Sequence, residues 1–120
     1  MIEEIDSDHA RIIELINNLE MLVSTGSGSS PIMEILSTII DEFEHHFENE
    51  ACLMNSARYA HRDEHISIHG VLFDKLSRFV YLLETGDSGV DRLILEFLNS
   101  WINFHVVEYD KKLAQTLLRR

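Results

Sequence analysis

A histidine and a glutamate interrupt an apolar helical stripe in the middle of the chain. The stripe advances in steps of three and four residues, as the core-facing side of a helix does. Its members are Ile32, Leu36, Ile39, Phe43, His46, Glu50 and Met54. An isolated buried charge is costly unless it is hydrogen-bonded, paired or bound to a metal. His46 and Glu50 therefore predict a polar site inside the core.

Five further side chains that can bind a metal lie near the ends of three other apolar stripes. They are His9 near the start of the first stripe, His65 and His69 at the start of the third, and His105 and Asp110 near the end of the fourth. Residues four apart on a helix differ by about 40° in direction, so the pairs in the second and third stripes can each aim two donors at one point.

The four stripes predict four helices joined by fairly short connections. The first follows a cap formed by Asp6, Ser7 and Asp8 and runs to Val23, the second covers about 32–55, the third 63–84, and the fourth runs from 90 towards the C-terminus. This pattern predicts an all-α, up-down-up-down antiparallel four-helix bundle, a single domain over residues 1–120. In that topology the seven side chains all meet at one end of the bundle.

The combined donor set is too large for one zinc ion, which usually takes four ligands. Five imidazoles and two carboxylates suit two first-row metals bridged by the carboxylates. Ligation by nitrogen and oxygen without thiolates favours iron or manganese over copper(I), and the choice between iron and manganese stays open at this point.

Asp110 does not fit a regular helix, because it follows His105 by five residues. In an α-helix that spacing separates two side chains by about 140°. They can share a face only if the helix widens into a π-type turn or breaks, as often happens at functional sites. We therefore predict an irregularity between the two residues, and a straight helix with Asp110 in solvent would contradict its role as a ligand.

The order and spacing of these residues resemble the hemerythrins, whose pattern is H, HxxxE, HxxxH and HxxxxD on four helices. The matching segments are IDSDH at 5–9, HFENE at 46–50, HISIH at 65–69 and HVVEYD at 105–110. The resemblance covers nearly the whole chain and includes Phe47, Met54 and Trp101.

The resemblance implies two non-haem iron ions joined by an oxo or hydroxo group, with O2 as their ligand. His65, His69 and His105 would hold one iron, His9 and His46 the other, and Glu50 and Asp110 would bridge them. O2 would bind as hydroperoxide at the two-histidine iron, which keeps an open position. The candidate residues for an apolar O2 pocket are Phe47, Trp101 and Ile102, for which plain core packing is an equally good explanation.

The composition is that of a globular protein, with 45 % hydrophobic and 26 % charged residues. A net charge of −11 argues against a nucleic-acid surface. No apolar run reaches the roughly 20 residues of a membrane span, and no signal peptide is evident, so we expect a cytoplasmic protein without a membrane partner. The single Cys52 is expected to be a small, semi-buried residue, and His45 and His61 to face solvent or the surroundings of the site.

Three classes of function fit these patterns. The first is an O2-binding protein, either a carrier or store, or a sensor module read by a signalling domain or partner chain. The second is a di-iron enzyme with peroxidase, nitric-oxide or iron-handling activity. No acid or base beyond the ligands stands out in the sequence, so we expect no enzymatic activity. The third is a metal-free helical interaction module.

Overall fold

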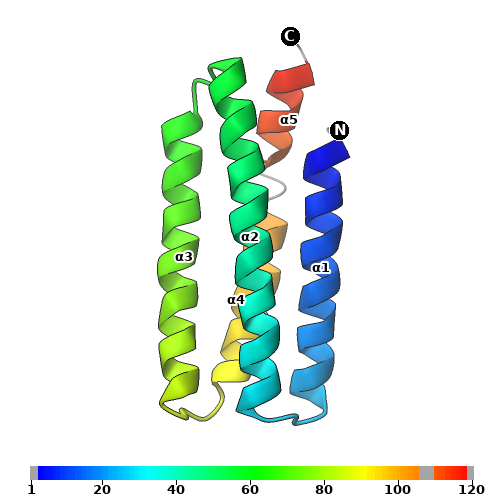
Figure 1. Cartoon of the computed structure of the whole chain (residues 1–120), viewed down its shortest axis with the longest axis vertical. Helices are drawn as coiled ribbons and strands as arrows, with labels where there is room; N and C mark the ends of the chain where they lie inside the picture. Colours follow the sequence, from blue (N-terminus) through cyan, green and yellow to red (C-terminus); the bar gives the residue numbers. More distant parts are fainter. Residues whose placement is uncertain (1–2, 106–109, 119–120) are drawn as a thin grey trace.

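The computed structural model describes the backbone of residues 3–105 and 110–118, and the side chains of 9–105 and 110–116. All regular structure in these ranges is helical, which confirms the predicted all-α class. The helices are α1 (Glu3–Ser24), α2 (Ser29–Ala57), α3 (Arg62–Glu84), α4 (Val90–His105) and α5 (Lys111–Leu118) (Figure 1).

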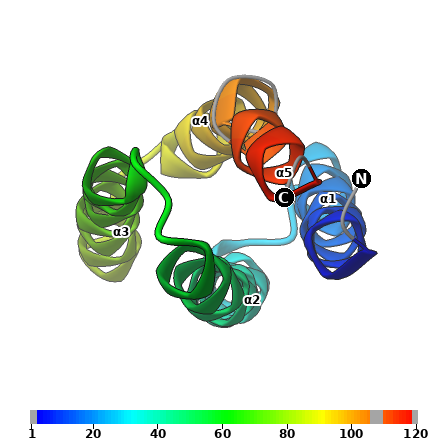
Figure 2. The same cartoon turned by 90° about the horizontal axis from the view of Figure 1, so that it is seen from above.

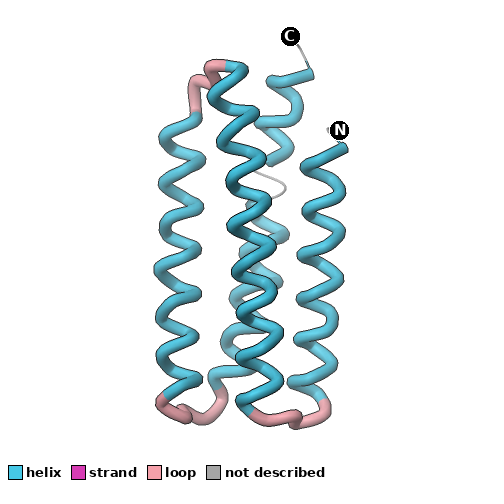
Figure 3. Tube along the Cα trace, viewed as in Figure 1, coloured by secondary structure: helices cyan, strands magenta, loops and turns pink. Residues whose placement is uncertain are grey.

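The four long helices form an antiparallel bundle. Each packs against two others: α1 contacts α2 and α4, and α3 contacts α2 and α4. Seen along the bundle, these four helices occupy the corners of a square, and α5 lies above the end of α4 (Figure 2). The connections α1–α2 and α3–α4 lie at one end, and the α2–α3 connection at the other (Figure 3). The predicted up-down-up-down topology is therefore confirmed.

The helices extend beyond the predicted limits in places. Because α1 already includes Glu3, Asp6, Ser7 and Asp8 lie inside it, and the prediction that they cap it is wrong. A carboxylate still suits the first turns of a helix through the macrodipole, so sequence signals alone placed the start too late. The helix α2 begins at Ser29, which puts Pro31 in the first turn, where its missing N–H leaves no hydrogen bond unmade.

Two apolar clusters fill the bundle and lie on either side of the layer of predicted ligands. The larger runs from the α1–α2 end up to Phe47 and Ile102. The smaller lies at the other end and consists of Met54, Tyr59 and Leu113, with Leu53 and Ile66 packed against it. The polar layer is therefore enclosed by apolar side chains along the bundle axis.

Two expectations about the outer surface have different outcomes. Cys52 is exposed rather than semi-buried, because it lies on α2 between the buried Glu50 and Met54 and so points away from the core. His45 and His61 are exposed, which agrees with the first of the two predicted alternatives, that they face solvent. No described helix has the length and hydropathy of a membrane-spanning segment.

Candidate metal centre

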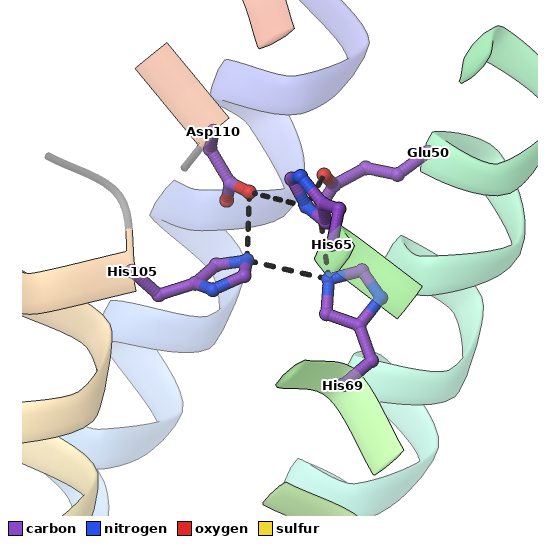
Figure 4. Close-up of side chains that lie close together, drawn as sticks. All are labelled: Glu50, His65, His69, His105 and Asp110. Carbon is purple, nitrogen blue, oxygen red and sulfur yellow. Dashed lines mark hydrogen bonds and ion pairs between the residues drawn. The ribbon is translucent and has the colours of Figure 1, made fainter. Parts of the chain in front are cut away.

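The seven predicted ligands come together in one buried layer. Their exposed fractions lie between 0 and 6 %. They are His9 from α1, His46 and Glu50 from α2, His65 and His69 from α3, His105 from the last turn of α4, and Asp110 immediately before α5. Five of them are drawn in Figure 4, where their side chains point toward one another from α2, α3, α4 and the start of α5.

The layer divides into two groups of donors that share one residue. Glu50, His65, His69, His105 and Asp110 form one group, and His9, His46 and Asp110 form the other; within each group the donor atoms lie within 4.8 Å of one another. Each group is the size of a first coordination shell for a single ion. The division of the histidines is the one that the hemerythrin resemblance implies, and their role as ligands stays a prediction.

Asp110 lies between the two groups and turns one oxygen towards each. Its Oδ2 lies 2.5 Å from Nε2 of His9 and 3.4 Å from Nε2 of His46. Its Oδ1 lies 2.7 Å from Nε2 of His105 and 3.2 Å from Nε2 of His65. A carboxylate placed in this way can bridge two cations, because each oxygen has its own set of neighbouring nitrogens.

Glu50 also faces histidines from both groups. Its Oε1 contacts Nε2 of His46 and lies 3.9 Å from Nε2 of His69, while its Oε2 lies 2.8 Å from Nε2 of His65. The two carboxylates thus lie among the same nitrogens, and all of these contacts use the Nε2 atom of the imidazole.

The predicted irregularity after His105 involves residues 106–109, which lie outside the described residues. On either side of them, α4 ends at His105 and α5 begins at Lys111, and Asp110 has π-type backbone hydrogen bonding. The side chain of Asp110 is fully buried. The arrangement that would contradict a ligand role, Asp110 facing solvent, is therefore not the one observed.

The buried polar atoms of the layer do not satisfy one another fully through hydrogen bonds, and bound cations would satisfy them better. Both oxygens of Glu50 and the Oδ1 of Asp110 are buried without a hydrogen bond of normal geometry among the described residues. The Nε2 atoms of His69 and His105 face each other at 3.3 Å. Buried polar groups are nearly always satisfied, and two cations among these lone pairs would satisfy them. The donor set of nitrogen and oxygen without sulfur suits iron or manganese.

The electrostatics of the layer shift the pKa values of three histidines in two directions. Burial alone would lower the pKa of His46 and His65, but their contacts with Asp110 and Glu50 raise these pKa values to about 10 and about 9. Burial and the neighbouring His105 and His65 lower the pKa of His69 to about 2.

The pKa of Asp110 falls well below its ordinary value. Burial opposes this shift, but the surrounding imidazoles, first among them His105, outweigh it. The carboxylate is therefore ionised at neutral pH and available to a cation.

Aromatic rings cover the layer on the side of the large apolar cluster. Phe47 stacks on His69, with ring centres 3.5 Å apart and planes 4° apart, and Trp101 stacks on His105 at 4.2 Å and 13°. Ile102 is 5 % exposed and belongs to the same cluster. Phe47 and Trp101 thus touch predicted ligands directly, while the pocket role of all three residues stays a prediction.

Sequence reasoning did not anticipate that Leu113 helps to close the layer on its other side, next to the predicted core residue Met54. Leu113 comes from α5 and packs with Met54 and Tyr59. Its place depends on how α5 is positioned relative to α4, which the stripe of the fourth helix does not reveal. The signal that was available is the apolar residue three positions after Asp110, the spacing of a shared helical face.

Comparison with known proteins identifies the family. The model of the hemerythrin HHE cation binding domain matches residues 1–117. A bacteriohemerythrin of Pseudomonas aeruginosa (strain PAO1) is 30 % identical over 105 residues, which cover 88 % of this chain and 67 % of the relative. A bacteriohemerythrin of Stenotrophomonas maltophilia (strain R551-3) is 27 % identical over 113 residues, covering 94 % of this chain and 72 % of the relative. No solved structure gives a significant match. The chain belongs to the hemerythrin family.

Proposed function

We propose that this chain binds O2 reversibly at a dinuclear non-haem iron centre. The observation that carries the proposal is the position of Asp110, whose Oδ2 faces His9 and His46 while its Oδ1 faces His65 and His105. In a metal-free core, burying a carboxylate among two groups of imidazoles costs desolvation free energy. Well-packed apolar side chains of similar volume would be at least as stable there.

Each ligand has a defined place in this proposal. His65, His69 and His105 hold one iron, and His9 and His46 hold the other, which therefore has fewer protein ligands. Glu50 and Asp110 bridge the pair and offset part of its positive charge. When bound, an iron pair of this kind supplies two electrons to O2 and takes them back on release.

The protein surroundings favour binding over further reaction. The ligands are 0–6 % exposed, and apolar clusters lie on both sides of them, which limits access of water. Phe47 stacks on His69 and Trp101 stacks on His105, so each of these two imidazoles has an aromatic ring on one face. A dry site of this kind limits the proton delivery that would release the reduced oxygen as hydrogen peroxide.

Binding rather than catalysis is also supported by what else is buried. Among the described residues, every buried imidazole or carboxylate belongs to the seven predicted ligands. A peroxidase or reductase would be expected to keep a separate acid or base near the metal. Two biological roles follow from reversible binding: a carrier or store, and a sensor whose state is read by an attached domain or a partner chain.

Anaerobic reconstitution tests the proposal directly. We expect about two iron ions per chain, a charge-transfer band on exposure to O2, and disappearance of that band under vacuum or argon. A chain that takes up no iron would contradict the metal centre. One that takes up two irons but is oxidised at once by O2 would contradict a carrier or store and leave redox sensing as the role.

A pair of histidine variants tests the ligand assignment. We expect His69→Ala to lose at least one iron per chain, because His69 is buried among the other donors. His61→Ala is the matched control, since His61 lies before α3, is exposed and pairs only weakly with Glu64 at 3.8 Å. Iron per chain, measured after gel filtration, should fall only in the first variant. Equal iron contents in the two variants would exclude His69 as a ligand.

Iron uptake should release protons, because the metal needs the Nε2 lone pairs that protons occupy. In the metal-free chain the pKa values of His46 and His65 are raised to about 10 and about 9. Both side chains are therefore imidazolium cations at pH 7, with a proton on each ring nitrogen. Each must lose one proton to bind iron, so about two protons should leave per chain. The affinity for iron should rise with pH up to about 9 and level off above 10, by about one decade per pH unit for each proton released.

Anaerobic calorimetry in two buffers with different ionisation enthalpies measures this release. A binding enthalpy that is the same in both buffers at pH 7 would show that these histidines are neutral in the metal-free chain.

A further inference from the structure

A groove on the outer surface of the bundle leads to the predicted metal centre from the side of α2 and α3. Its volume is about 400 Å³. The residues that line it are Glu44, Phe47, Glu48 and Ala51 from α2, and Ile66, His69, Gly70 and Phe73 from α3. Both sets have the spacing i, i+3, i+4, i+7, so one continuous stripe of each helix faces the groove.

Small residues on both helices keep this groove open. Ala51 and Gly70 present little or no side chain, and a Cβ added at Gly70 would meet no atom within 4 Å. The backbone at Gly70 is ordinary helix, so its conformation does not require glycine. Glycine costs up to about 1 kcal/mol relative to alanine in a helix, and here it preserves empty space beside the centre.

The floor of the groove consists of a predicted ligand and its stacking partner. Phe47 and His69 are 7 and 5 % exposed, and their rings are parallel at 3.5 Å. Phe47 also meets Phe73 edge-on at 5.3 Å, and the rings of His46 and Trp101 lie 5.5 and 6.0 Å from it on its other sides. A displacement of this one ring would connect the groove with the interior of the ligand layer.

The lining also defines which molecules can use the groove. Its inner part is apolar, and its two charged side chains, Glu44 and Glu48, are exposed carboxylates at the rim of a chain whose net charge is −11. Carboxylates near an entrance repel anions and leave neutral molecules unaffected. The lining therefore favours small, neutral, apolar molecules, a class that includes O2.

We propose that the groove between α2 and α3 is the entrance through which small neutral gases reach the centre, with Phe47 as its movable gate. This inference rests on the proposed function in that O2 is the natural occupant. The gate itself depends only on Phe47, His69 and the space left by Gly70.

The variant Gly70→Leu tests the entrance by filling it. A barrier on an entry route raises the same transition state for arrival and departure, so both O2 rate constants should fall several-fold by the same factor and the equilibrium constant should not change. Ser77→Leu is the matched control, because Ser77 is an exposed residue of α3 that does not line the groove. Stopped-flow and flash-photolysis measurements give the two rates. Unchanged rates in Gly70→Leu, with iron content intact, would overturn the proposal.

Azide binding to the oxidised iron form tests the same entrance without any need for O2 binding. Its association rate should also fall several-fold in Gly70→Leu. In Glu44→Gln/Glu48→Gln it should rise several-fold at low salt, whereas the O2 rate should stay constant. An azide rate indifferent to all three substitutions would overturn the proposal. A wild-type chain that binds azide through the groove but does not bind O2 would instead refute the proposed function alone.

Xenon supplies a measurement that requires no metal. In the metal-free chain of residues 1–120 under xenon pressure, the methyl resonances of Ala51 and Ile66 should shift in the wild type and in Ser77→Leu. The Ile66 shift should be lost in Gly70→Leu. Equal xenon-induced shifts in the wild type and Gly70→Leu would show that the groove is not the place where an apolar gas accumulates.

Discussion

Five imidazoles and two carboxylates lie together in one buried layer of an otherwise apolar bundle, and this is the main constraint on the structure. Burial removes most of the hydration that such groups need, and contacts among themselves restore only part of it, since both oxygens of Glu50 and one of Asp110 lack a well-formed hydrogen bond among the described residues. Positive charge within the layer, from protons or from metal ions, offsets this cost. The two groups of donors, with Asp110 common to both, indicate where two cations would lie.

The fold provides the stability that the layer does not. Below the layer, a continuous apolar cluster that includes Ile39, Leu72 and Leu98 is fully buried and is contributed by all four long helices. Burial of side chains of this size contributes about 1.5–3 kcal/mol each, enough to fix the helices before any metal is present. The predicted ligands are thus held by a scaffold that does not need them, an arrangement that would favour precise metal geometry.

Periodicity in the sequence was sufficient for the fold and for the membership of the layer. A histidine or glutamate within a stripe such as that of α2 must point inward, and antiparallel topology then places His9, His46, His65 and His105 at one level. The pattern was less informative where a result depends on an end or a surface. The early start of α1 depends on a local balance that a stripe does not record. The exposure of Cys52 follows from its place off the stripe of α2, to which the expectation of partial burial gave too little weight.

The groove between α2 and α3 was also absent from the sequence-based account, for a different reason. Its defining feature is missing volume at Ala51 and Gly70, and small residues within a helix have no distinctive period of their own. The residues that line the groove can be recognised only when the structure shows that His69, a buried residue, also forms part of the groove wall. Periodicity identifies which residues are buried, whereas a groove can be located only when the positions of both helices are known.

The position of α5 shows how closely the site and the rest of the chain are linked. Asp110 immediately precedes this helix and contacts histidines from all four long helices. One turn later, Leu113 packs with Met54 and Tyr59. The start of α5 is therefore held by electrostatic contacts at Asp110 and by apolar packing at Leu113, and only the contacts at Asp110 depend on charge in the layer. A change in that charge acts directly on Asp110, and through three residues of backbone on Leu113.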